Sequence, residues 1–145
     1  MDQSIKKYEL KKNDTGFDRV TITSSKAAYD VIKQFYFEDI GIFESFFILL
    51  LDNSNSTIGY AKISQGGITG TVVDPIIVAK YAVDSLAKGI VIAHNHPSGQ
   101  LKASGSDIKI TQKIKDGLNL FDIRVLDHVI LTEDGYFSFA DRGIL

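Results

Sequence analysis

Cysteine is absent from this sequence of 145 residues, and only two prolines occur in it. Without cysteine there is no disulfide bond and no thiolate metal site, so a bound metal would need histidine, carboxylate, backbone or water ligands. The sequence has no stretch of about 18 apolar residues that would span a membrane, and residues 1–14 lack the apolar core of a signal peptide. We therefore expect a cytoplasmic protein that makes no membrane contact.

Neither sign of charge dominates the composition. Sixteen Lys and Arg residues oppose 18 Asp and Glu residues, which gives a net charge of −2, and the sequence pI is about 5.9. This balance provides no bulk attraction to nucleic acid, where affinity depends on how many phosphates are neutralised. With 44% hydrophobic and 23% charged residues, the chain is typical of one soluble globular domain.

The spacing of apolar residues divides the chain into an N-terminal arm, residues 1–19, where it is irregular, and a domain, residues 20–145, where it is regular. Within the domain, alternating or continuous apolar runs predict strands, and apolar spacings of three and four residues predict helices. The expected strands cover residues 20–25, 44–51, 57–64, 89–93 and 123–131, with a closing hairpin over 132–139 and helices that begin near residues 24, 75 and 106. This β-α-β-β-α-β-α-β-β order predicts an α/β fold of three layers, in which helices flank a mixed sheet.

The stretch AHNHPSGQLKASGSD follows the predicted strand GIVIA. Because side chains alternate along a strand, His94 and His96 should face one side and Asn95 the other, at the carboxyl end where open α/β sheets place ligands. Ser104 and Asp107 fall in the first turn of the next predicted helix, from which Asp107 can reach back toward the histidines. Two imidazoles and one carboxylate form a three-ligand set that leaves the fourth position of a zinc ion to water, as in catalytic sites.

Each part of this pattern also has a simpler interpretation. Ser104 and Asp107 form the Ser-x-x-Asp pattern in which the serine caps a helix and the acid favours its positive end, and such a cap can coexist with metal binding. His128 lies in the apolar run LDHVIL on the same face as Leu126, which is typical of a core histidine that bonds a neighbour. Asp127 lies on the opposite face and could instead be the polar residue near the site, but neither Asp127 nor His128 is predicted to be a ligand.

The order His-x-His, seven residues, Ser, two residues, Asp resembles the signature of the JAMM (JAB/MPN) metalloprotease superfamily. Within that superfamily, HNHPSG, LDHVIL and GYFSF are similar to the RadC-like family, and the likeness runs from about Thr21 to the C-terminus. The resemblance implies a zinc metallopeptidase or isopeptidase with a layered fold like that of cytidine deaminases. It also implies that His94, His96 and Asp107 are the zinc ligands.

The same resemblance implies the catalytic groups. RadC-like domains carry a glutamate before an apolar strand of the form E-x-F-x-x-L-x-L-D, and Glu44 in ESFFILLLD occupies that position. Glu44 would then be the general base, and the Ser104 hydroxyl would stabilise the oxyanion together with the metal. Glu38, Glu133 and Asp74 are alternative acids, and the simpler interpretation of Glu44 is a solvated residue at the end of a strand.

Two functions stay open at this point. The first is hydrolysis of a peptide or isopeptide bond in an unknown peptide or protein substrate. The second is a non-hydrolytic role in DNA repair or other DNA transactions, the activity associated with RadC-like proteins. Full-length RadC proteins carry an upstream helix-hairpin-helix region, which residues 1–20 are too short to hold. With few phosphate contacts on offer, we expect DNA binding no tighter than about 10⁻⁴–10⁻⁶ M.

Two other classes of enzyme fit the sequence poorly. Zinc deaminases share the layered architecture but need His-x-Glu and cysteines, which the sequence lacks. HNH nucleases share only the letters of the motif, because they spread their histidines over a hairpin and a helix. The sequence leaves the oligomeric state open.

Overall fold

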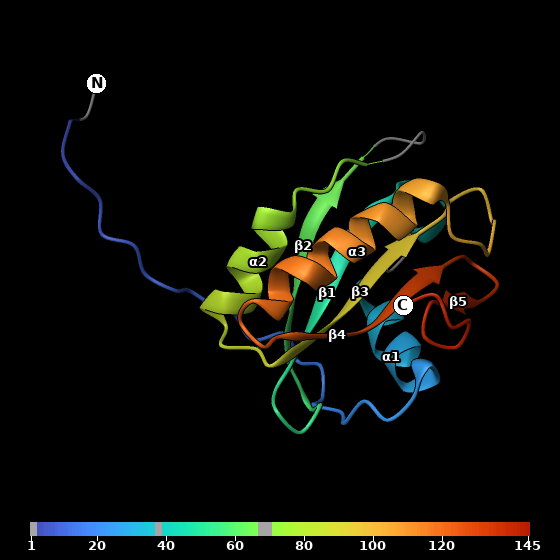
Figure 1. The fold of residues 1–145 in the computed structure, drawn as a ribbon, viewed down its shortest axis with the longest axis horizontal. Coiled ribbons are helices and arrows are strands. Elements are labelled where there is room, and N and C mark those ends of the chain that lie inside the picture. Colours follow the sequence, from blue (N-terminus) through green and yellow to red (C-terminus); the bar gives the residue numbers. More distant parts are fainter. Residues whose placement is uncertain (1–2, 37–38, 67–70) are drawn as a thin grey trace.

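A computed structural model describes residues 3–36, 39–66 and 71–145 of the chain. The described residues form three α-helices, five strands and two short 3₁₀ helices (Figure 1). In chain order these are α1 (Ser25–Ile32), η1 (Lys33–Phe35), η2 (Asp39–Gly41), β1 (Ser45–Leu51), β2 (Thr57–Gln65), α2 (Pro75–Asp84), β3 (Gly89–Asn95), α3 (Gly105–Asn119), β4 (Arg124–Leu131) and β5 (Tyr136–Ser138).

The strands form one mixed sheet in the order β2-β1-β3-β4-β5. β1 pairs antiparallel with both β2 and β3, β3 pairs parallel with β4, and β4 pairs antiparallel with β5. β3 is therefore the central strand. Every residue of β1 and β3 is buried, as expected of strands that are covered on both faces.

Helices cover both faces of this sheet, which confirms the predicted three-layer α/β fold. α1 packs on one face, against alternate strand residues such as Phe47, Val91 and Val129. α2 and α3 pack on the other face, against the intervening residues such as Ile48 and Ile92. The alternation of side chains along each strand thus divides the core into two clusters.

Side-chain caps fix where the three helices begin. The hydroxyl of Ser24 accepts a hydrogen bond from Ala27 at the start of α1, and the carboxylate of Asp74 accepts one from Ile76 at the start of α2. Pro75 occupies the first turn of α2, where a missing N–H costs nothing. Ser104 caps α3 in the same way. These caps agree with the helix starts predicted from the sequence.

The strand predicted over residues 20–25 is wrong. Among the described residues this segment makes only an isolated bridge, between Thr21 and Ser56, although Ile22 is buried. The physical reason lies in its partner: the segment runs along the short turn between β1 and β2, where the Ile22 N–H bonds the Asn55 carbonyl, and a turn offers no extended edge for a ladder. The observed order therefore begins with α1.

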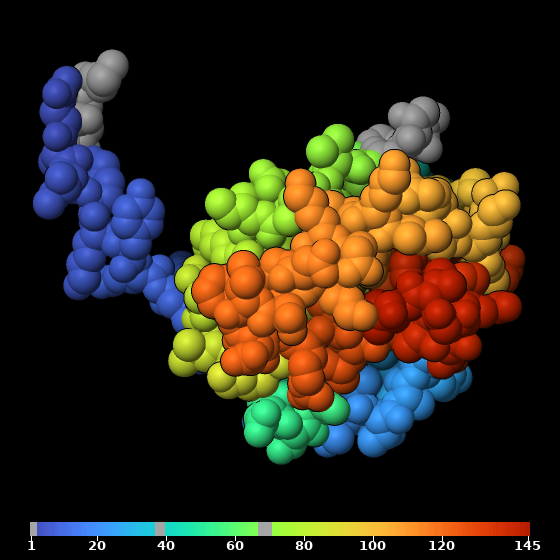
Figure 2. Space-filling view, in the orientation of Figure 1, coloured from blue at the N-terminus to red at the C-terminus, as the bar shows by residue number. Residues whose placement is uncertain are grey.

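The N-terminal residues lie outside the packed domain. Residues 3–16 are all exposed, and much of this segment stands away from the body of the molecule (Figure 2). Contact with the domain begins at Phe17, whose ring lies 5.9 Å from that of Phe35. Within the part of the chain that the structure describes, no helix is both long and apolar enough to cross a bilayer.

Substitution of two leucines near the end of α3 tests how this helix packs on the sheet. Leu118 is 1% exposed and lies in the core, whereas Leu120 is 81% exposed. We expect Leu118→Ala to lower the free energy of unfolding by about 2–5 kcal/mol, because it removes core contacts and leaves a cavity. The matched Leu120→Ala should change it by no more than about 0.5 kcal/mol. Urea unfolding followed by circular dichroism measures both, and equal effects would contradict the packing.

Candidate metal centre

The chain segments that carry the predicted site residues meet at one end of the sheet. His94 is the penultimate residue of β3, and His96 follows that strand directly. β1 runs antiparallel to β3 with Phe46 opposite His94, so Glu44, just before β1, lies beside the end of β3. Asp107 is in the first turn of α3, the helix that follows the loop after His96.

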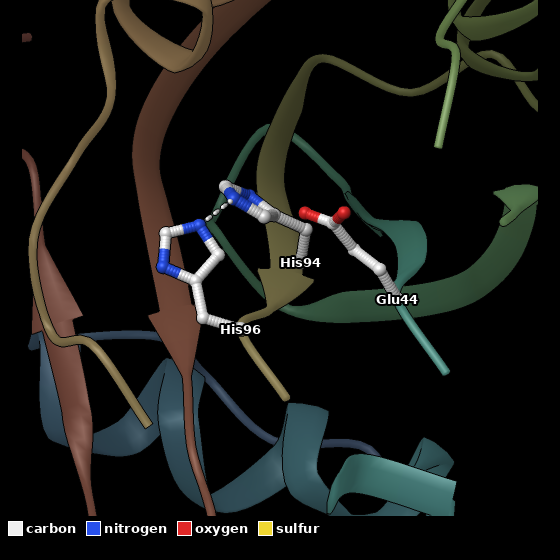
Figure 3. Close-up of side chains that lie close together, drawn as sticks. All are labelled: Glu44, His94 and His96. Atoms are coloured by element: carbon white, nitrogen blue, oxygen red, sulfur yellow. Dashed lines mark hydrogen bonds between the residues drawn. The ribbon is translucent and has the colours of Figure 1, made fainter. Parts of the chain in front are cut away.

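The two histidines converge as the alternation of β3 predicts. Their Nε2 atoms are 2.9 Å apart, and the carboxylate of Glu44 turns toward the ring of His94 (Figure 3). One ligand atom from each of Glu44, His94 and His96 lies within 4.8 Å of the others. His94 is buried, and the other two side chains are half-buried. These three residues form a cluster that can hold a metal ion.

Asp107 contacts the same two imidazoles. Its Oδ1 lies 3.3 Å from Nε2 of His94, and its Oδ2 lies 3.4 Å from Nε2 of His96. A reciprocal capping box holds this carboxylate in place, because the Ser104 N–H donates to Oδ2 at 2.8 Å and the Asp107 N–H donates to the Ser104 hydroxyl at 3.0 Å. Capping and proximity to the histidines therefore coexist in Asp107, as the sequence suggested.

Hydrogen bonds on the far side of each ring set the histidine tautomers. Nδ1 of His96 lies 2.8 Å from the carbonyl oxygen of Gln100, which only accepts, so Nδ1 carries the proton. The neutral ring then has its lone pair on Nε2. This is the arrangement that leaves Nε2 free to bind a metal ion.

A longer chain of hydrogen bonds sets the tautomer of His94. The Thr111 hydroxyl donates to the Asp107 carbonyl at 2.6 Å and so accepts from Nδ1 of His128 at 2.5 Å. Nε2 of His128 therefore accepts from Nδ1 of His94 at 2.6 Å. The lone pair of His94, like that of His96, is then on Nε2. Two imidazole lone pairs and a carboxylate that meet at one point are a donor set that fits a divalent cation such as zinc.

The electrostatics of the cluster favour ionised Asp107. Burial alone would raise the pKa of Asp107, but the side chains of His94 and His96 beside its two oxygens outweigh burial and hold this pKa well below its usual range. The hydrogen bond to Asp107 raises the pKa of His96. Burial, followed by the nearby His94, lowers the pKa of His128 well below its usual value, so His128 is neutral.

The other polar residues weighed in the sequence lie elsewhere or have structural partners. His128 is the buried, hydrogen-bonded core histidine that was predicted, and its partners are His94 and Thr111. Asp127 accepts bonds from Ser138 and from two backbone N–H groups instead. Asp74 caps α2, Glu133 is exposed, and Glu38 lies outside the described residues.

The sequence did not predict the contact between His128 and His94. It also predicted no hydrogen-bond partner for Asn95, whose side chain bonds the backbone of Ile40, Phe43 and Ser45. His94 and His128 are 34 residues apart, and they meet because β3 and β4 pair in parallel with Ile92 opposite His128. The available signal was that His128 lies between the apolar residues Leu126 and Ile130 on one face of the strand. That signal predicts a buried partner but does not identify it.

Comparison with known proteins agrees with the resemblance to RadC-like domains. Residues 22–144 match the family model described as the RadC-like JAB domain. A UPF0758 protein of Flavobacterium johnsoniae is 45% identical over 123 residues, which cover 85% of this chain and 53% of the relative. A UPF0758 protein of Porphyromonas gingivalis is 41% identical over 128 residues, covering 88% of this chain and 56% of the relative. The chain thus spans about half the length of these relatives.

The ion pair between His96 and Asp107 can be tested in protein treated with a chelator. Since Asp107 raises the pKa of His96, Asp107→Asn should move that pKa back toward 6.5. The pair stabilises the fold below pH 6.5, where His96 is protonated even in the unfolded chain, and this contribution is lost as the pH rises through the raised pKa.

An NMR titration of the His96 ring protons measures the shift, with Asp116→Asn on the exposed side of α3 as the matched control. The control should leave the pKa of His96 unchanged. An unchanged value in Asp107→Asn would show that the two side chains do not interact in solution.

Proposed function

This chain belongs to the family of RadC-like JAB domains, and from that premise we propose that it is a zinc-dependent hydrolase that cleaves an amide bond, either peptide or isopeptide. The observation that carries the proposal is the convergence of two imidazole Nε2 lone pairs and the Asp107 carboxylate, with the Glu44 carboxylate beside them. Three protein ligands and an open position are typical of catalytic rather than structural zinc.

We assign His94, His96 and Asp107 as the residues that hold the ion. Asp107 is preferred to Glu44 as the third ligand because its Oδ1 lies 3.3 Å from Nε2 of His94 and its Oδ2 lies 3.4 Å from Nε2 of His96, and the capping box of α3 orients it. When bound, zinc supplies Lewis-acid chemistry: it polarises an amide carbonyl and makes water acidic enough to lose a proton near neutral pH.

Glu44 and Ser104 would move and stabilise charge. Glu44 lies near the histidines without a place in the preferred ligand set, so its carboxylate can take a proton from the attacking water and pass it to the leaving amine. The oxygen of the Ser104 hydroxyl is occupied as an acceptor in the α3 cap, which leaves its hydrogen available to donate to the developing oxyanion.

The substrate and the cellular role concern the whole protein, of which this chain matches about half in its relatives. The matched region covers 53% and 56% of the two relatives, so the activity of a whole protein of this family comes to this chain only as a proposal. We propose a peptide or protein as substrate. The alternative, a non-hydrolytic role in DNA transactions, would be favoured by submicromolar DNA binding that survives physiological salt.

The first prediction of this proposal concerns metal content. Purified without added metal or chelator, the protein should carry about one zinc ion per chain, since three convergent ligands suit zinc. His96→Ala and Asp107→Asn should lose most of it, while Asp116→Asn on the same helix as Asp107 should retain it. Elemental analysis by mass spectrometry gives the stoichiometry. Protein that contains no zinc and binds none on titration would refute the proposed centre.

The second prediction separates the base from the ligands. Glu44→Gln should still bind one zinc ion, with an affinity reduced by no more than about tenfold, because Glu44 contributes only a nearby negative charge and no bond to the metal. The same variant should lose hydrolysis of whichever substrate a panel of peptides and isopeptides identifies for the wild type.

Glu133→Gln, at an exposed acid that the sequence offered as an alternative, serves as the control and should keep both properties. If Glu44→Gln lost the metal altogether, Glu44 would be a ligand and the assignment of Asp107 would have to be revised.

A further inference from the structure

Asn95, the middle residue of the HNH stretch, has a fully buried side chain, and its hydrogen bonds within the described part of the chain all go to main chain before and at the start of β1. Its Oδ1 accepts from the Ser45 N–H at 2.8 Å. Its Nδ2 donates to the carbonyls of Ile40 and Phe43, each at 2.7 Å. A rotated amide would set Oδ1 against two carbonyl oxygens, so the network fixes the orientation of the side chain.

Two of these hydrogen bonds hold the peptide groups on either side of Glu44. The carbonyl of Phe43 belongs to the peptide bond before Glu44, and the N–H of Ser45 belongs to the peptide bond after it. Peptide groups are planar, so the two flanking planes determine φ and ψ of the residue between them. The carbonyl of Glu44 itself accepts from the Gly66 N–H at 2.9 Å. Asn95 therefore sets the direction in which the Glu44 side chain leaves the backbone.

The position of Asn95 in β3 relates these hydrogen bonds to the candidate site. Its immediate neighbours in the chain are His94 and His96, whose rings lie on the other side of the strand. One residue thus links the backbone that carries the two imidazoles to the backbone that carries the carboxylate. A carboxylate that acts as a base must lie within hydrogen-bond reach of its proton, and a displacement of about 1 Å can cost about 10²-fold in rate.

We propose that Asn95 is a positioning residue that holds Glu44 at a fixed place relative to the histidine pair. The proposal rests on the proposed function insofar as Glu44 is the general base. Its structural content, a carboxylate held near the metal position by Asn95, does not depend on which bond is cleaved. It can therefore be tested by metal binding as well as by hydrolysis.

A double-mutant cycle on zinc affinity provides the test. Zinc dissociation constants are measured by competition with a chelating dye for the wild type, Glu44→Gln, Asn95→Ala and the double variant. In the wild-type background Glu44→Gln should weaken binding about 3- to 10-fold, since it removes a negative charge near the cation. In the Asn95→Ala background the same change should matter less than about twofold, because the released carboxylate no longer stays near the ion.

Tyr36→Phe is the matched control. The Tyr36 hydroxyl donates to the Ser45 carbonyl at 2.9 Å, so this variant also removes a buried hydrogen bond from the start of β1. It leaves both peptide groups of Glu44 bound to Asn95. In the Tyr36→Phe background, Glu44→Gln should therefore have its full wild-type effect. Asn95→Ser, which keeps a smaller hydrogen-bonding group, replaces Asn95→Ala in the cycle if the alanine variant does not fold.

The outcomes separate the two claims. Equal effects of Glu44→Gln with and without Asn95, including no effect in either chain, would overturn the positioning role even if the wild type hydrolyses peptides. Coupling in zinc affinity without hydrolysis of any substrate would support the positioning role and contradict the hydrolase. If both hold, Asn95→Ala should also lower kcat about 10²-fold with KM little changed.

Discussion

The antiparallel register between β1 and β3, which sets Phe46 opposite His94, brings two chain segments together that are about 50 residues apart in sequence. The segment that enters β1 carries Glu44, and the segment that leaves β3 carries His94 and His96. A shift of this register by one residue would turn each buried side chain of β1 to the other face of the sheet. Because one face of β1 packs on α1 and the other on α2 and α3, that shift would also disrupt both core clusters. Core packing and the geometry of the site therefore depend on the same pairing.

A second constraint reaches the site from α3. The Asp107 carbonyl, the Thr111 hydroxyl, His128 and His94 form one continuous chain of hydrogen bonds through the interior. A buried polar network of this kind is favourable only when its members are satisfied, and among the described residues no buried side-chain polar atom lacks a partner. This series of hydrogen bonds joins three elements, α3, β4 and β3. It holds the imidazole of His94 in the tautomer that a metal needs. Two of the three proposed ligands, His94 and Asp107, thus lie on β3 and α3, and His96 follows β3 directly.

Local patterns in the sequence were sufficient for much of this arrangement. Alternation along GIVIAHNH predicted that His94 and His96 share a face, and the Ser-x-x-Asp spacing predicted the cap that orients Asp107, because both depend on residues close together in the chain. Contacts between distant segments could not be predicted in this way. No spacing pairs His128 with His94, and nothing local shows that Asn95 turns back to the backbone around Glu44. The strand predicted before α1 failed for the same reason, since its alternation was local but its neighbour was a turn.

The central claim is that a metal ion binds between His94, His96 and Asp107, with Glu44 next to it but not bonded to it. A crystal structure of the zinc-loaded protein, with anomalous diffraction data collected at the zinc absorption edge, tests this most directly. The account predicts a single strong anomalous peak about 2.0–2.2 Å from both Nε2 atoms and from one Asp107 oxygen, with the Glu44 carboxylate beyond bonding distance. A peak that is bonded to Glu44 in place of Asp107, or the absence of a peak at this end of the sheet, would contradict it.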